Sequence, residues 1–370
     1  MIFDEIQFTP RTKVGTPKFL QLANYLEKWI KSHKMADGTK FPSDRQLSRK
    51  LGLTTVTVSK SLKELERIGL IARKTGSGTF IASENRVSNS KKTRPLRIGI
   101  ACHVPITTDW YSTSVVTFFH EYWQGKNCEL VSLILSGEDY QRGIEEYHLD
   151  GMFIILPLKQ YIPNMLRLAE KKFPFVTIGA PFPELASHSL HCDYISPGVK
   201  AIKYLYKLGH RKIGYITCDY PSPSALGRLK GYLQGMYEVS LTVNPLWLSA
   251  TNIFSCEMNF DFEKQLCEML SDKKRPSALL VHGHVKISSV FDTVKKLKLN
   301  IPRDISLIAF DDPYYLEHLN PPVTTFRQPL KEMVELAGKR LDAMITKGEK
   351  SPIGIFGPIF IERASCARII

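Results

Sequence analysis

Apolar residues near the start of the chain recur every three or four positions, the spacing that places them on one face of a helix. In the first such stretch they fall at Leu20, Ala23, Leu26 and Ile30. Two further short stretches with the same spacing follow and meet at Gly52. The pattern therefore predicts three packed helices, of which the last two are joined by a tight turn.

The second and third helices carry start and stop signals. Ser43 stands where an N-cap belongs, and Asp44 supplies negative charge to the first turn. Gly52 can take the left-handed conformation that ends the second helix, and Thr54 can cap the third. The inward-facing spacing leaves hydroxyls and lysines on the outer face of the third helix, namely Thr55, Thr57, Ser59, Lys60 and Lys63. Such a face suits a groove lined by base edges and phosphates.

Two strand-like segments follow the third helix and close around a Gly-Ser-Gly turn. These segments are residues 70–74 and 79–82. Gly76 and Gly78 leave the tip without bulk, so its N–H groups can approach a phosphate or enter a minor groove, flanked by Arg73 and Lys74. This is the plan of a winged helix-turn-helix, which reads DNA. The alternative is a plain helix pair with a surface hairpin.

Beyond Pro95 the pattern changes to short apolar runs that alternate with stretches of helical spacing. Seven runs predict strands: residues 96–101, 130–135, 152–156, 175–178, 212–216, 278–281 and 306–309. Helices between buried strands imply right-handed crossovers and parallel sheets that are covered on both faces. Roughly 270 residues are many for one such sheet, so we expect two α/β lobes that face each other.

The expected fold class is α/β, with an N-terminal winged helix-turn-helix followed by a two-lobed domain. The expected parts are a DNA-binding domain at residues 1–82, a linker at 83–95 and the two-lobed domain at 96–370. Lobe one is expected at about residues 96–195 and 324–350, and lobe two at about 196–320 and 353–368. The linker is polar and basic, which is typical of a solvated tether or of a further phosphate contact.

Positive charge is concentrated in the first quarter of this 370-residue chain, whose formal net charge is +14. Residues 1–95 hold nineteen lysines and arginines against eight acidic residues, whereas the remainder holds thirty-one against twenty-eight. Cationic side chains release counterions from a polyanion, so the expected partner is DNA. No basic helix with bulky apolar anchors accompanies the charge, which argues against binding to a membrane surface.

The seven cysteines are scattered without CxxC spacing, which indicates reduced thiols and neither a zinc site nor a disulfide framework. No apolar run reaches eighteen residues, and the first residues do not have the pattern of a signal peptide, so we expect a cytoplasmic protein. The sequence contains no GxSxG, HExxH or phosphate-binding loop. We therefore expect no enzyme activity, catalytic residue, cofactor or metal.

Ligands of open α/β sheets bind beyond the carboxyl ends of the strands. The candidates in such places are aromatic or polar: His103, Asp109, Trp110, Tyr111, Asp193, His282, His284 and Asp311. Aromatic rings can stack on a sugar ring and carboxylates can accept bonds from hydroxyl pairs, so a small polar ligand such as a sugar fits. His282 and His284 would share a strand face, as metal ligands can, but without a third ligand we favour hydrogen bonding.

The runs FPSDRQLSRKLGL, LKELERIGLI and GSGTFI carry a specific resemblance. Through them, residues 16–82 resemble the DNA-binding domain of the GntR family of transcription regulators. The resemblance implies that DNA is faced by Arg45, Thr55, Thr57, Ser59 and Gly78. Family members commonly carry arginines where this chain has Thr55 and Ser59, so the operator is expected to be atypical.

Four further runs occur in order: KYLYKLGHRKIGYI, GRLKGYLQGM, IPRDISLIAFDDPYYLEHLNPPVTTFRQP and IERASC. By these, residues 97–368 resemble the effector-binding domain of the LacI/GalR family, which is similar to type I periplasmic sugar-binding proteins. The resemblance implies that Arg228, Asp311 and Asp193 contact the ligand. Gly283 and His284 stand where the family usually has an Asn-Asp pair, and the family's hinge helix is absent. An effector other than an ordinary hexose is therefore expected.

A GntR-type reader joined to a LacI-type sensor resembles the arabinose-responsive repressors of some bacteria. From the joined reader and sensor we expect a homodimer that binds a palindromic operator. It is expected to repress carbohydrate-utilisation genes and to respond to a small sugar-like effector. The alternative is a sugar-binding sensor or adaptor that acts through a protein partner.

Overall fold

The computed structural model describes residues 2–11, 16–74, 76–82, 95–102, 110–135, 139–217, 222–249, 262–283, 285–349 and 354–369. Its contacts divide the chain into two compact units. The first unit is Met1–Ala101 with Trp123–Met152, and the second is Cys102–Tyr122 with Phe153–Ile370.

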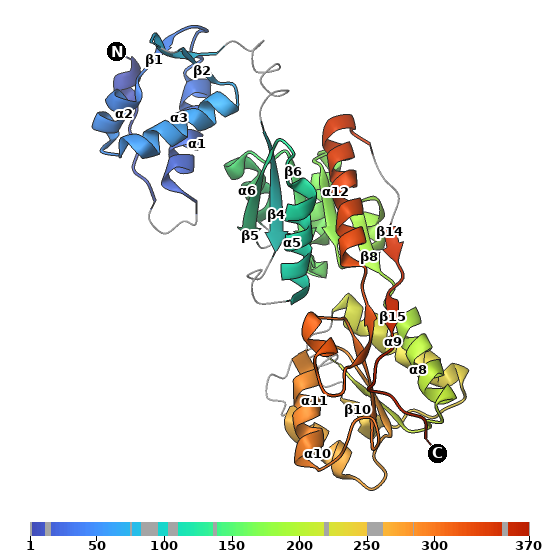
Figure 1. Cartoon of the computed structure of the whole chain (residues 1–370). Coiled ribbons are helices and arrows are strands. Elements are labelled where there is room, and N and C mark those ends of the chain that lie inside the picture. The colour runs from blue at the N-terminus through green and yellow to red at the C-terminus, as the bar shows by residue number, and fades with distance from the viewer. Residues whose placement is uncertain are drawn as a thin grey trace. The chain divides into compact units, whose positions relative to one another are not determined.

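The chain begins with three helices and a small antiparallel sheet (Figure 1). The elements are η1 (Ile2–Glu5), α1 (Lys18–Ser32), β1 (Lys40–Phe41), α2 (Asp44–Leu51), α3 (Thr55–Arg67), β2 (Ile71–Lys74) and β3 (Gly78–Ile81). The strand order is β1-β3-β2, so β2 and β3 form the expected hairpin. The predicted winged helix-turn-helix is confirmed.

Local capping fixes the two helices of the turn. The Ser43 side chain and Gln46 form a reciprocal capping box at the start of α2. Gly52 ends α2 with a φ of 62°, a left-handed conformation that glycine adopts without strain. The Thr54 hydroxyl then accepts from the N–H of Thr57 and caps α3.

The core of this domain takes in the start of the chain. Ile6 is buried in the cluster formed by Leu26, Leu62 and neighbouring apolar residues. The Phe3 ring lies 5.7 Å from that of Trp29 and 5.4 Å from that of Phe41. The first residues therefore belong to the domain.

A six-stranded sheet follows, in the order β14-β8-β7-β6-β4-β5. Its strands are β4 (Leu96–Cys102), β5 (Cys128–Ile134), β6 (Gly151–Ile155), β7 (Phe175–Ile178), β8 (Ser189–Cys192) and β14 (Gly354–Phe356). The associated helices are α5 (Trp110–Trp123), α6 (Tyr140–Tyr147), η4 (Lys159–Tyr161), α7 (Ile162–Glu170), η5 (Pro183–His188) and α12 (Leu330–Lys347).

A second six-stranded sheet has the order β10-β9-β11-β12-β13-β15. Its strands are β9 (Ile213–Ile216), β10 (Leu248–Ser249), β11 (Ala278–Val281), β12 (Ser306–Phe310), β13 (Thr324–Arg327) and β15 (Ile359–Ile361). The associated helices are α8 (Ser196–Lys207), α9 (Pro223–Glu238), η6 (Pro245–Trp247), α10 (Phe262–Ser271), α11 (Val285–Lys296) and η7 (Tyr314–Glu317). β15 is antiparallel to β13, and the other pairings are parallel.

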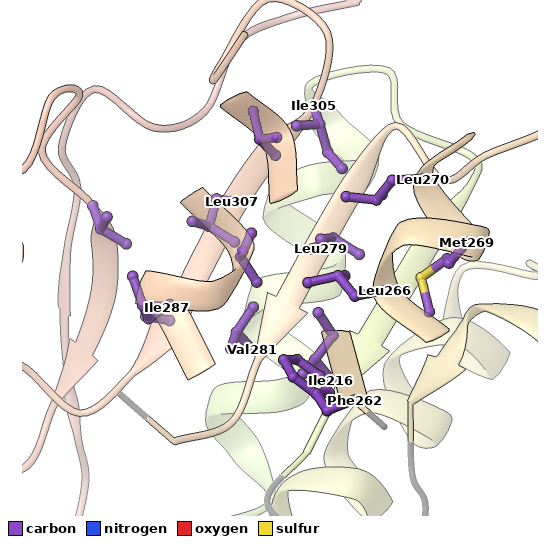
Figure 2. Close-up of a cluster of buried hydrophobic side chains, with 14 of the residues drawn as sticks. Ile216, Phe262, Leu266, Met269, Leu270, Leu279, Val281, Ile287, Ile305 and Leu307 are labelled. Carbon is purple, nitrogen blue, oxygen red and sulfur yellow. The ribbon is translucent and has the colours of Figure 1, made fainter. Parts of the chain in front are cut away.

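Alternate side chains of β11 pack into two separate cores, as expected of a strand buried on both faces. Leu279 and Val281 pack with Leu266 of α10 and Ile287 of α11 (Figure 2). Leu280 packs on the other side, in the cluster that contains residues of α8 and α9. Each of the seven expected strands is present, and the predicted two-lobed α/β fold is confirmed.

Two short strands are placed differently from the expected lobe bounds. β13 pairs within the second sheet, although residues 324–350 were expected in lobe one. β14 pairs with β8 in the first sheet, although residues 353–368 were expected in lobe two. The chain thus changes sheet after β13 and again after β14, because strands this short are placed by their partners and not by a local pattern. The division into domains otherwise stays a prediction. Within the described residues, no helix is both long and apolar enough to cross a membrane.

Candidate functional site

The first turn of α3 presents its side chains to solvent. Thr55 is exposed, and Val56 is 63% exposed although it is apolar. The Thr57 hydroxyl lies 2.9 Å from that of Thr54, so Thr57 contributes to the cap as well as to the surface. Ser59 is half-buried one turn further on.

Of the other residues predicted to contact DNA, some are exposed and others contact side chains within the domain. Arg45, Gly76 and Gly78 are exposed. Arg73 donates to Asp44 at 2.9 Å, which ties the hairpin to the start of α2. The Lys60 and Lys74 ammonium groups lie 5.9 Å and 5.5 Å from the ring centroids of Phe19 and Phe80, with both lysines exposed. Sequence reasoning missed Val56. It could have been found as an apolar residue at a position that does not face the core.

The second unit contains a buried ion pair at the end of β12. Arg228, on α9, donates to both carboxylate oxygens of Asp311, at 3.0 Å and 2.8 Å. Asp311 has a φ of 69°, and Thr325 donates to its backbone carbonyl at 2.5 Å. Gln328 donates to Asp311 Oδ1 at 2.6 Å. Burial pushes the pKa of Asp311 upward, but Arg228 and the bond from Gln328 outweigh it and hold the pKa below its usual value.

Aromatic rings surround the guanidinium of this pair. Its central carbon lies 4.8 Å from the Phe310 ring centroid and 5.6 Å from that of Tyr194. The Tyr194 hydroxyl donates to the carbonyl of Gly179 at 3.0 Å, and burial raises the pKa of that hydroxyl. The guanidinium is therefore held by cation–π contacts as well as by hydrogen bonds.

A pocket of about 480 Å³ lies beside Gln328 in the same unit. Gln328 is 6% exposed, and its Oε1 has no hydrogen-bond partner among the described residues. Trp110 of α5 contributes an aromatic wall, and Asp312 receives bonds from Arg363 at 2.7 Å and 3.0 Å. The pocket thus combines a ring surface with amide and charged groups, which suits a polar molecule with hydroxyl groups.

The other predicted ligand residues occupy different surroundings. Asp193 accepts from the N–H groups of Ile195 and Ser196, so this carboxylate shapes the start of α8. The Tyr111 side chain lies against Gly179 and is buried. The His282 Nδ1 lies 3.4 Å from the Thr217 hydroxyl, and its ring meets Phe310 edge-on.

Three predicted residues, His103, Asp109 and His284, lie outside the described residues. In the part of the chain that the structure describes, no group of three His, Cys, Asp or Glu side chains could hold a metal ion. Sequence reasoning missed Gln328 and Tyr194, although Gln328 stands in the quoted run that ends TTFRQP.

Comparison with known proteins identifies two domain types in the chain. Residues 19–81 match the model of the bacterial regulatory proteins of the gntR family, and residues 202–366 match that of the periplasmic binding protein-like domain. The arabinose metabolism transcriptional repressor of Geobacillus stearothermophilus is 28% identical to this chain, over 95% of this chain and 98% of that protein. The protein of the same name from Halalkalibacterium halodurans is 25% identical, over 88% and 90%.

Solved structures share the fold of the two-lobed domain. A regulatory protein of the LacI family from Chloroflexus aggregans has a TM-score of 0.64 at 21% identity, over 74% of this chain and 99% of that one. A LacI family transcriptional regulator from Enterococcus faecium, solved with bound ribose, has a TM-score of 0.61 at 18% identity, over 74% and 100%.

Proposed function

Because this chain joins a GntR-type winged helix-turn-helix to a periplasmic-binding-protein-like domain, we propose that it is a transcriptional repressor whose binding to operator DNA responds to a sugar or sugar derivative. The observation that carries the proposal is the presence of both sites in one chain. An exposed recognition surface on α3 accompanies a polar pocket lined by Gln328, whose side chain is held by Asp311.

The DNA contact is assigned to the first turn of α3, to Arg45 and to the tip of the hairpin. Thr55 and Val56 reach base edges in the major groove, while Lys60 and Lys74 contact phosphates. Gly76 and Gly78 carry no side chain, so the hairpin tip can lie close to the sugar–phosphate backbone. Two copies of the chain on a palindromic operator in the cytoplasm complete this model.

The effector is assigned to the pocket beside Gln328. Trp110 offers a face for stacking, and Gln328 Oε1 can accept a bond from a hydroxyl group. The lining has equal numbers of acidic residues (Asp312, Glu317, Glu332) and basic residues (Arg327, Lys331, Arg363), so the site suits a neutral, hydroxyl-rich ligand such as a pentose. The names of two relatives refer to arabinose metabolism, which makes L-arabinose the first sugar to test.

The test begins with duplexes selected from a random pool by the full chain. The proposal expects one protected site in a footprint, a steep fall of affinity with salt, and a change of affinity when one sugar is added. A thermal-shift screen of sugars identifies that effector, because bound ligand raises the melting temperature by mass action. Unchanged DNA affinity at a saturating concentration of a sugar that binds would contradict the proposal.

The second candidate function is a sugar sensor or adaptor that acts through a protein partner. It predicts the same thermal shift but neither a discrete footprint nor a steep dependence on salt. Catalysis has no part in either proposal, and turnover of the bound sugar would contradict both.

A further inference from the structure

The recognition helix carries a buried carboxylate near its C-terminal end, away from its first turn. Glu64 is 4% exposed. Its two oxygens accept from Arg97 Nη1 and Nη2, both at 2.8 Å. Arg97 belongs to β4, the first strand of the sheet that follows the winged helix domain, and is 7% exposed. A carboxylate buried this deeply needs such a partner.

The hydrogen bonds of Arg97 are almost complete. Its Nε donates to Glu129 at 2.7 Å, and its Nη1 also donates to the carbonyl of Tyr147 at 3.1 Å. Its backbone N–H donates to Asp150 at 2.8 Å, and Arg67 Nε donates to Glu64 at 2.8 Å. Two arginines, Arg67 and Arg97, thus donate to the buried carboxylate of Glu64, so its charge is compensated within one network.

A second set of contacts joins α1 to the end of α6, within the same unit. Asn24 donates to the carbonyl of Glu146 at 3.0 Å, and His148 Nε2 lies 3.5 Å from a carboxylate oxygen of Glu27. His148 ends α6 in the left-handed conformation, with a φ of 50°. In the winged helix domain, α1 packs on α3. Residues of β4 and of the end of α6 therefore hold both of these helices.

We propose that Glu64 and Arg97 are positioning residues that fix the recognition helix to the effector-binding domain, so that movement of β4 reorients the reading surface. The inference rests on the proposed function. Thr55 lies nine residues before Glu64, which is about 14 Å along a helix. Holding α3 near Glu64 therefore sets the direction of its first turn and leaves that turn open to DNA.

The attachment is tested in the full chain without DNA or sugar. Spin labels are placed at Arg49 and Gln124, which are exposed in the first unit, through amino acids that do not react with the native cysteines. Double electron–electron resonance should give one narrow distance distribution for the parent chain. Arg97→Met and Glu64→Gln should broaden it at least twofold, whereas Glu64→Asp, which keeps the charge, should broaden it less.

Glu129→Gln is the matched control, because it removes the carboxylate that Arg97 Nε contacts. The Glu129 side chain is 53% exposed, so its loss should leave the distance distribution narrow. A broad distribution in the parent chain, or a narrow one in a folded Arg97→Met chain, would overturn the proposal. Glu64→Gln keeps the shape of the side chain and decides the question if Arg97→Met does not fold.

The link to function is measured with the selected duplex and L-arabinose, or the sugar found by the screen. The ratio of DNA affinities without and with sugar should fall towards one in Glu64→Gln, while the salt slope stays that of the parent chain because the phosphate contacts are unchanged. An unchanged ratio would overturn the positioning role. A parent chain that gives a narrow distance distribution but binds no DNA would instead contradict the proposed function and leave the attachment established.

Discussion

Arg228 and Asp311 are 83 residues apart in the sequence and form a two-bonded ion pair in the interior of the second unit. The Arg228 side chain is 4% exposed and that of Asp311 14%. Each ion depends on the other, because a buried charge without its partner is very unfavourable. The pair therefore supports the fold and holds Gln328, which reaches the pocket, in place.

Asp311→Asn should destabilise the two-lobed domain and weaken sugar binding. The substitution leaves Arg228 buried without a counter-charge, a change that costs about 3–5 kcal/mol. The midpoint of urea unfolding and the thermal shift with sugar measure the two effects. Because the pKa of Asp311 is held below its usual value, its contribution is present above about pH 4 and is lost as the pH falls further.

Glu238→Gln is the control for this prediction. It removes a carboxylate that Lys203 contacts at 2.6 Å at the surface, between α8 and α9. Exposed pairs contribute little, so the midpoint should stay that of the parent chain. Equal midpoints for Asp311→Asn and Glu238→Gln would show that the buried pair is not a support of the fold.

Protonation of the buried His210 should reduce the stability of the folded protein on mild acidification. Its ring is 2% exposed, with Nδ1 2.9 Å from the Ser277 hydroxyl and Nε2 3.1 Å from the Ala367 carbonyl. Burial lowers the pKa of His210 and outweighs the bond to Ala367, which acts to raise it. The unfolded chain therefore binds the proton more readily, and stability falls as the pH drops below about 6.5.

The measurement is the free energy of unfolding from pH 7.5 to pH 5. One histidine contributes a slope of at most about 1.4 kcal/mol per pH unit. His210→Asn should reduce the slope, whereas His318→Asn, at an exposed histidine, should leave it unchanged. A slope that is the same in both variants would exclude His210 as its source.

The sequence predicted the elements whose signals are local. Ser43, Gly52 and Thr54 act on their own helices, so the helix expected between the Ser43 cap and Gly52 agrees with the observed α2. β14 has three residues and pairs with β8, far back in the chain, so no local pattern marks it. Phe3 and Ile6 show no periodicity, and only the packed core reveals their role.

In the candidate site, too, the sequence indicated single residues but not the contacts between them. The resemblance pointed to Arg228 and Asp311 separately, but it did not indicate that they bond to each other. Asp193 was expected to contact ligand and is found holding the start of α8, with its neighbour Tyr194 next to Arg228. Gln328 matters through its contact with Asp311, which depends on the tertiary fold. Contacts between distant segments are the part that one sequence does not encode in a readable pattern.

Gly231→Ala should disrupt the packing of α9 on α8. A Cβ at Gly231 would lie 2.1 Å from the carbonyl oxygen of Ile195, a backbone atom that cannot move aside alone. Overpacking of this kind costs about 1–3 kcal/mol or more. Gly357→Ala is the control, because nothing lies within 4 Å of its Cβ. Thermal melting compares the two, and equal melting temperatures would show that the two helices can separate without cost.

Val56 should determine sequence preference without supporting the fold. It is 63% exposed on the first turn of α3, so its methyl groups are free to meet a thymine methyl in the major groove. Val56→Asn should lower affinity for the selected duplex and change the preferred base at one position by about 1–3 kcal/mol. The melting temperature and salt slope of the Val56→Asn chain should match those of the parent chain.

Lys60→Ala should instead weaken binding to all duplexes alike and reduce the salt slope by about one. Binding to the selected duplex and its single-base variants, across a salt series, separates the two roles. A Val56→Asn chain that binds every duplex equally less well would show that Val56 does not read bases.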